Sequence, residues 1–173
     1  MTTRHLYIMR HAKSDWSSEA PGDFERPLAT RGAQAAVLMG EWMTQYQVRP
    51  ERIISSPARR AEQTVHTVAE VLGYDTDRIV WEPRVYDADV KTLLEIVAAW
   101  DREPASVMLV GHNPGFEDLV RHLAGDNLGV HDRAKLMPTA ALAALGMPDA
   151  WNALPAGCAK VEFITRPREI DNG

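Results

Sequence analysis

An arginine and a histidine stand side by side where an apolar run gives way to a polar loop. Arg10 and His11 directly follow the run 6–9, Leu-Tyr-Ile-Met, which is typical of a buried strand in a parallel sheet. In open α/β folds, the groups just beyond the carboxyl end of a strand line the ligand crevice. The pair by itself also fits a surface cation beside a structural histidine, so its meaning depends on what accompanies it.

The same arrangement occurs a second time. The apolar run 106–110 ends in Gly111-His112-Asn113-Pro114-Gly115, where Gly111 permits a close backbone approach and Pro114 suits the first turn of a following helix. A single histidine in a turn is more often structural than catalytic. Two apolar strands that each deliver a histidine favour a chemical role for both.

A third junction supplies a further cation. The segment 52–57 is typical of a short strand and turn, and a helix is predicted to begin at Ser56 or Pro57, which places Arg59 in its first turn. A cation there is unfavourable because the helix N-terminus already carries partial positive charge, and a bound anion would remove the conflict. Arg60 is expected to point to solvent from another side of the helix.

These residue types suit phosphoryl transfer. His11 can act as a nucleophile if one ring nitrogen is bonded to a carbonyl and the other is aimed at phosphorus. The transferred group carries charge on three equatorial oxygens, which Arg10 and Arg59 would neutralise. His112, in its protonated form, would donate one more hydrogen bond.

Apolar periodicity predicts alternating strands and helices around these junctions. The expected helices are 33–46, 58–72, 90–100 and 114–123, and the expected strands are 6–9, 52–57 with its turn, 78–81, 106–110, 140–146 and 159–165. The last two strands are predicted to be a hairpin pair or edge strands. Residues 125–138 are expected to form a loop, and residues 166–173 a loosely held charged tail.

Composition bounds the remaining possibilities. With 173 residues, 45% of them hydrophobic, the chain is expected to form one domain, residues 1–173. Its 19 Lys and Arg against 24 Asp and Glu give a net charge of −5, which argues against a nucleic-acid or anionic-membrane binder. Cys158 is the single cysteine, so no intramolecular disulfide is expected, and a reducing, cytoplasmic location is predicted. No apolar run predicts a membrane span or a signal peptide.

The three junctions together resemble the histidine phosphatase superfamily, also called the phosphoglycerate-mutase-like family. The resemblance rests on Arg10-His11, on the segment 55–64 (Ser-Ser-Pro-Ala-Arg-Arg-Ala-Glu-Gln-Thr) and on the segment 111–115, in that order along the chain. The compact length of the chain and the amino-acid sequences of segments 10–14, 26–28 and 111–115 look most like those of the SixA-type phosphohistidine phosphatases. The resemblance implies a three-layer α/β/α sandwich with a mostly parallel central sheet and helices on both faces, and no metal or other cofactor.

Residue roles also follow from the resemblance. It implies that His11 is phosphorylated during turnover, that Arg10 and Arg59 clamp the phosphate, and that His112 stabilises the transferring group. Members that cleave phosphate esters carry a carboxylate after the third strand, and Asp87 is the chosen candidate for that general acid. Two further carboxylates lie in the same region, at Glu82 and Asp89. A phosphohistidine substrate relaxes the need for an acid, because imidazole leaves more readily than an alkoxide.

The sequence therefore predicts a metal-independent phosphatase that works through a phosphohistidine intermediate. The expected partner is a phosphorylated protein, such as a phosphotransfer or phosphorelay protein, or else a small phosphorylated molecule; the oligomeric state stays open. A small-molecule phosphomonoesterase or mutase is the alternative within the same chemistry. A non-catalytic module that binds phosphate or phosphoproteins is the alternative of another class. A nucleotide-binding protein is disfavoured because the loop after Met9 lacks glycine until Gly22.

Overall fold

The computed structural model describes residues 3–171 and contains a six-stranded sheet with the order β3-β2-β4-β1-β5-β6. The strands alternate with helices along most of the chain, as their apolar periodicity predicts. Their bounds are β1 (Arg4–Arg10), β2 (Arg52–Ser55), β3 (Val80–Trp81), β4 (Ser106–Gly111), β5 (Leu142–Met147) and β6 (Lys160–Thr165).

The first four strands pair in parallel, and β5 pairs antiparallel with both of its neighbours, β1 and β6. β1 and β2 both pair in parallel with β4, and β3 pairs in parallel with β2. The late strands form the expected hairpin pair, because β6 pairs antiparallel with β5. β5 in turn runs antiparallel to β1, and β6 is the edge strand on this side of the sheet. Because β1, β2 and β4 point the same way, their carboxyl ends meet at one edge of the sheet.

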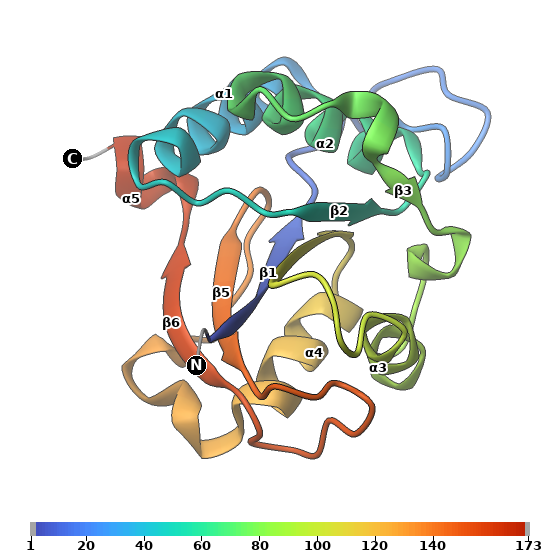
Figure 1. Ribbon diagram of the computed structural model, residues 1–173. Helices are drawn as coiled ribbons and strands as arrows, with labels where there is room; N and C mark the ends of the chain where they lie inside the picture. The colour runs from blue at the N-terminus through green and yellow to red at the C-terminus, as the bar shows by residue number, and fades with distance from the viewer. Residues whose placement is uncertain (1–2, 172–173) are drawn as a thin grey trace.

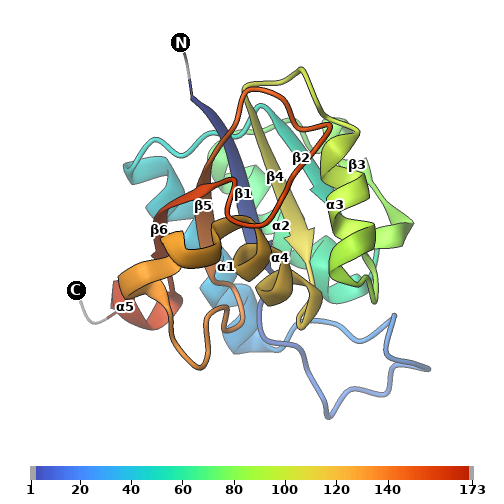
Figure 2. The same cartoon turned by 90° about the horizontal axis from the view of Figure 1, so that it is seen from below.

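Helices cover both faces of the sheet (Figures 1 and 2), so the predicted three-layer α/β/α arrangement is confirmed. One face carries α1, α2 and α5, and the other carries α3 and α4. Their bounds are α1 (Thr30–Gln45), α2 (Arg59–Leu72), α3 (Val90–Ala98), α4 (Gly115–Ala124) and α5 (Pro167–Asp171), with 3₁₀ turns η1 (Thr76–Arg78), η2 (Pro83–Val85) and η3 (Gly125–His131).

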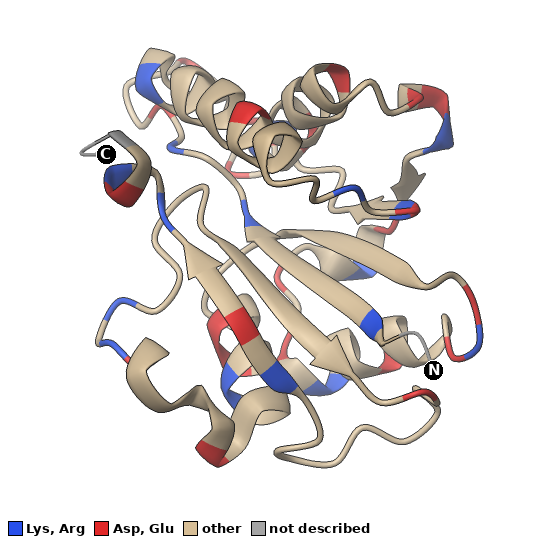
Figure 3. Ribbon diagram, turned by 60° about the vertical axis from the view of Figure 1, so that its left-hand side comes forward, with Lys and Arg blue, Asp and Glu red and all other residues tan. Residues whose placement is uncertain are grey.

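The alternation of strand side chains builds two cores. In β1, Leu6 and Ile8 pack toward α3 and α4, whereas Met9 packs toward α1 and α2; Met108 of β4 also faces α1 and α2. All four side chains are fully buried. The central strands are drawn almost wholly in tan in Figure 3, because charged residues lie mainly at their ends. Two buried faces therefore hold the carboxyl edge of the sheet in place.

The two segments expected to lack structure are ordered in part. Residues 125–131 form η3, and Leu128 packs into the core on the α3 and α4 face. The tail prediction is wrong for the described residues up to 171: Arg166 is buried, its guanidinium donates to the carbonyl of Leu136, and Ile170 packs onto the α1 face. Residues 172–173 lie outside the described range.

Within residues 3–171, none of the helices has the length and apolarity that crossing a membrane requires.

Candidate active site

The predicted chemical residues meet where the parallel strands end. The backbone N–H of His11 donates to the carbonyl of Gly111 at 2.9 Å, and the N–H of Ser56 donates to the carbonyl of Val110 at 3.0 Å. These two bonds continue the strand pairing one residue beyond β1 and β2. They bring the segments after three strands into one pocket, as expected for the carboxyl edge of a parallel sheet.

The ring of His11 is held in one orientation. Its Nδ1 lies 2.7 Å from the carbonyl of Ala12, and a neutral ring must therefore carry its proton on Nδ1 and leave Nε2 with a lone pair. The N–H of Ala12 donates to Oγ1 of Thr64 at 3.0 Å, and that hydroxyl donates to the carbonyl of Arg60 at 2.7 Å. The loop that carries the histidine is thus tied to the first turns of α2.

Burial is the main reason that the pKa of His11 falls to about 4. The bond to the Ala12 carbonyl opposes this shift, and the positive charges of Arg60, Arg10 and Arg26 add to it. His11 is therefore neutral at pH 7, which is the state that a nitrogen nucleophile requires.

His112 lies against His11, with ring centroids 5.2 Å apart. Its Nε2 is 2.8 Å from Oγ of Ser56, and that oxygen accepts from the N–H of Ala58 at 3.2 Å. The oxygen of Ser56 has a second lone pair, so this contact allows either direction for the bond to His112; the other ring nitrogen, Nδ1, is buried and has no hydrogen-bond partner among residues 3–171. When the ring carries a proton on Nδ1, that N–H is a donor without a partner in the described residues.

The surroundings of His112 oppose the protonated state that the sequence predicts for it. Burial, and after it the proximity of His11 and Arg60, lower the pKa of His112 to about 3. At pH 7 the ring is neutral before an anion binds. A doubly charged phosphoryl group would replace some of the lost solvation and favour the protonated ring.

Arg10 is placed as the sequence predicts. The half-buried side chain anchors through Nη1, which donates to the carbonyl of Met137 at 3.1 Å. Its Nε is buried and finds no acceptor in the described part of the chain. A charged donor that lacks an acceptor beside a histidine is suited to an anionic substrate.

The two arginines at the start of α2 exchange the places expected for them. Arg60 is 5% exposed and its charge acts on both histidines, so the prediction that it points to solvent is wrong. The side chain of Arg59 is half-exposed and forms an ion pair with Glu62 at 2.7 Å on the outer face of the helix. The physical reason is the phase of the helix: the buried residues of α2 recur at 60, 61, 64, 65, 68 and 69, so Arg60 lies on the buried face and Arg59 lies off it.

A carboxylate that the sequence did not single out holds Arg60. Asp23, in the loop between β1 and α1, accepts from Nη2 of Arg60 at 3.0 Å and from the hydroxyl of Tyr86 at 2.7 Å, and it pairs with Arg26. The backbone carbonyl of Asp23 accepts from Nη1 of Arg60 at 2.6 Å. The bond from Tyr86, followed by the two arginines, holds the pKa of the Asp23 carboxyl well below its ordinary value. The Nε of Arg60 stays buried without an acceptor in the described residues.

Tyr86 and Arg26 complete the surroundings. The ring of Tyr86 meets the ring of His112 edge to face at 5.5 Å. Arg26 donates from Nε to Oγ of Ser14 at 2.9 Å and lies 3.7 Å above the ring of Trp16. These residues come from polar loops without periodicity, so only the resemblance of segment 26–28 could have directed attention to one of them.

The acidic segment gives different roles to its three carboxylates. Glu82 binds the guanidinium of Arg84, and Asp89 caps α3 by accepting from the N–H of Thr92 at 2.9 Å. Asp87 follows Tyr86, is exposed, and has a positive φ of 55°. Its carboxylate makes no hydrogen bond to another residue in the range 3–171. Of the three candidates it is the one left available, and its role as general acid stays a prediction.

Among the described residues, His, Cys, Asp and Glu side chains do not gather in groups of three or more that could hold a metal ion. The site consists instead of two histidines between arginines.

The chain belongs to the histidine phosphatase superfamily (branch 1), whose family model matches residues 6–93. It is related to SixA: it is 30% identical to the phosphohistidine phosphatase SixA of Escherichia coli K12 over 148 residues, which cover 85% of this chain and 88% of that protein. It is also 32% identical to an uncharacterized protein of Mycobacterium tuberculosis over 165 residues, which cover 92% of this chain and all of that protein.

Solved structures agree with this placement. The structure of the protein histidine phosphatase SixA complexed with tungstate has a TM-score of 0.80 and 27% identity, and the match covers 96% of this chain and 99% of that one. A mycobacterial glucosyl-3-phosphoglycerate phosphatase has a TM-score of 0.63 at 19% identity, covering 92% of this chain and 97% of that one. The second likeness concerns the fold alone.

Proposed function

We propose that this chain is a metal-independent phosphatase that removes phosphate from protein phosphohistidine through a phosphorylated His11. The observation that carries the proposal is the state of His11: a buried, neutral ring whose Nδ1 is bound by a backbone carbonyl and whose Nε2 keeps its lone pair. A second histidine and two inward-facing arginines surround it. This is the arrangement that in-line attack on a phosphoryl group requires.

The reaction then has two halves. In the first, Nε2 of His11 forms a bond to phosphorus while the bond from phosphorus to the substrate nitrogen breaks, and the released imidazole takes up a proton from solvent, which the second half returns. In the second, water attacks the phosphohistidine, inorganic phosphate leaves, and the proton from water is passed to solvent. His11 returns to its neutral form, so the site turns over without an external donor or acceptor of electrons.

Arg60 replaces Arg59 in this scheme. Arg10 and Arg60 each keep guanidinium N–H groups that have no acceptor in the described residues and could donate to equatorial oxygens, whereas Arg59 spends its charge on Glu62 at the surface. His112 donates from Nδ1 to a third oxygen. As charge develops on the phosphoryl group, protonation of His112 becomes more favourable.

Two observations support phosphohistidine over a phosphate ester as substrate. The exposed Asp87 is the sole carboxylate of the acidic segment, within the described residues, that has no partner, so no hydrogen bond or ion pair holds it in place as an acid. An alkoxide needs a well-placed proton donor, and an imidazole leaving group needs it less. The relative named phosphohistidine phosphatase SixA points in the same direction.

The test is an EDTA-treated assay that offers a phosphohistidine peptide beside an aryl phosphate, followed by acid-labile phosphate analysis of the protein. We expect turnover of the peptide, preference for it over the ester, and label at His11. The variant His11→Asn keeps the size of the side chain and is expected to lose both turnover and label. His122→Asn is a matched control, because His122 lies on α4 and bonds to the carbonyl of Leu154 away from the pocket.

Other results would identify the alternatives. Label at His11 with preference for the ester would indicate a phosphomonoesterase and make Asp87 the next residue to replace. A chain that binds inorganic phosphate without turnover or label, and still does so as His11→Asn, would be a phosphate-binding module. Loss of activity in EDTA that added metal restores would contradict the metal-independent mechanism.

A further inference from the structure

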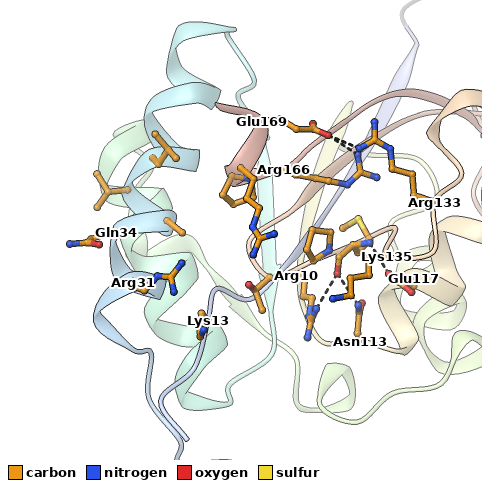
Figure 4. A pocket seen from close by; sticks show the side chains of 18 of the residues that line it. Arg10, Lys13, Arg31, Gln34, Asn113, Glu117, Arg133, Lys135, Arg166 and Glu169 are labelled. Atoms are coloured by element: carbon orange, nitrogen blue, oxygen red, sulfur yellow. Dashed lines mark hydrogen bonds and ion pairs between the residues drawn. The ribbon is translucent and has the colours of Figure 1, made fainter. Parts of the chain in front are cut away.

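A cleft of about 1170 Å³ opens beside the phosphoryl site. Arg10 and Asn113, which directly precede and follow His11 and His112 in the chain, line it (Figure 4). One wall is the start of α1, and the other is the segment 133–139 that precedes β5, with the start of α5 closing the far end. A substrate bound at His11 therefore has this cleft next to it.

Positive charge gathers in the cleft. Seven Lys or Arg and three Glu line it, although the whole chain carries a net charge of −5. The basic residues are Arg10, Lys13, Arg31, Arg133, Lys135, Arg166 and Arg168. A local reversal of the overall charge marks a surface that attracts anions.

Most of the basic side chains are not neutralised within the protein. Glu169 pairs with Arg133 at 2.9 Å and with Arg166 at 3.2 Å, so the charge of one carboxylate is shared between two arginines. Lys13, Arg31, Lys135 and Arg168 make no salt bridge to any residue in the range 3–171.

The exposure of these side chains indicates the kind of ligand. Lys13 and Arg31 lie on one side of the cleft and Lys135 on the other, and all three are exposed. Exposed cations on long stems around a wide cleft do not form a tight cage for one small anion. They suit an extended acidic surface, which they attract over several ångströms and orient on contact.

We propose that this cleft binds acidic side chains that flank the phosphorylated residue of a protein substrate. The inference rests on the proposed function, because it assigns the surroundings of the phosphohistidine to a surface beside His11. The partner is then a protein whose phosphorylated histidine lies next to Asp or Glu residues.

The test compares two phosphohistidine peptides that differ only in having Glu or Gln on both sides of the phosphorylated residue. We expect kcat/KM to be about tenfold higher for the Glu peptide at about 50 mM salt, and the preference to shrink toward unity at about 500 mM. The same two peptides, each carrying a non-hydrolysable phosphonate in place of the phosphoryl group, are titrated by fluorescence anisotropy, which needs no turnover.

A charge-reversal variant tests whether the cleft, rather than the rest of the surface, causes the preference for the Glu peptide. In Arg31→Glu/Lys135→Glu, the Glu peptide is expected to lose its advantage in both kcat/KM and binding. Arg49→Glu/Lys160→Glu makes the same change in net charge at exposed positions outside the cleft, and it is expected to keep the preference.

The outcomes are separable. Equal binding of the two phosphonate peptides by the native chain, or a preference that survives in the cleft variant, overturns the acidic-flank proposal. Displacement of the Glu peptide by pyrophosphate at concentrations equal to those of the peptide would also overturn it, in favour of a small substrate with two phosphates. Absence of turnover for both hydrolysable peptides refutes the proposed function, while the anisotropy result still decides the role of the cleft.

Discussion

Replacing Arg60 by alanine separates the two adjacent arginines of α2 by function. Nη1 and Nη2 of Arg60 each donate one N–H to Asp23, which leaves a second N–H on each of them, and the N–H of Nε, without an acceptor in the described residues. Arg60→Ala therefore removes one oriented, charge-assisted donor together with its positive charge. Arg59→Ala removes an ion pair with Glu62 on the outside of the helix.

The expected sizes differ widely. Loss of one donor aimed at developing charge lowers kcat by about 10²–10³, which corresponds to about 3–4 kcal/mol of transition-state stabilisation. An exposed ion pair three residues apart on a helix is worth about 0.2–0.5 kcal/mol of stability. We therefore expect Arg59→Ala to change kcat/KM by less than about threefold, since that energy concerns folding rather than the reaction.

The assay measures kcat/KM against phosphoramidate for both variants, with circular dichroism to verify that each is folded. The pH profile is a second readout. The positive charge of Arg60 contributes to the lowered pKa of His11. Removing that charge should raise this pKa and move the acid limb of kcat/KM to higher pH. Arg60→Lys keeps the positive charge but lacks the planar guanidinium. It should restore the pH of the acid limb more fully than it restores kcat. An Arg59→Ala loss equal to or greater than that of Arg60→Ala would refute this reasoning.

Three further predictions follow from the site. Acidification from pH 7 to pH 4.5 should lower the free energy of unfolding. In the unfolded chain both histidines bind a proton near pH 6.5, whereas in the folded protein the pKa of His11 is about 4 and that of His112 about 3. Between those pH values each histidine contributes a slope of about 1.4 kcal/mol per pH unit. Thermal melts of the two His→Asn variants across pH should show a shallower slope. Gly111→Ala should lower stability by about 1–3 kcal/mol, measured by urea unfolding, since its Cβ would lie 2.6 Å from the ring of Phe116. Asp87→Asn should leave kcat/KM for a phosphohistidine peptide within about twofold while lowering it for an aryl phosphate, and an equal loss for both substrates would contradict the minor role of that carboxylate.

Much of the fold could be predicted because its central strands are short, buried on both faces and bounded by clear turn signals. Residues 6–9 and 106–110 appear as strands, and Gly73 ends α2 in the left-handed conformation with a φ of 70°. The composition of residues 166–173 predicts a loose tail, but composition does not show that Arg166 donates to the carbonyl of Leu136 or that Ile170 packs on an apolar surface. Burial of a charged residue depends on a partner that is distant in sequence.

The misplacement of Arg59 and Arg60 has a narrower cause. The buried residues of α2 recur at 60, 61, 64, 65, 68 and 69, a helical stripe that includes Arg60 and omits Arg59. That spacing is present in the sequence and would have identified the inward arginine. The first-turn argument points instead to Arg59, because it assumes that the helix starts two or three residues earlier than it does.

The sequence by itself determined the class of fold, the family and the histidines that follow two strands, because these depend on periodicity and on short motifs. Only the tertiary structure decided which arginine faces the pocket, that Asp23 holds it, and that His112 is neutral before an anion binds. The gathering of Arg31 and Lys135 around one cleft also lay beyond the sequence. The reason is that charge, burial and pKa depend on distances between residues far apart in the chain, and these distances exist only once the sheet has brought its strand ends together.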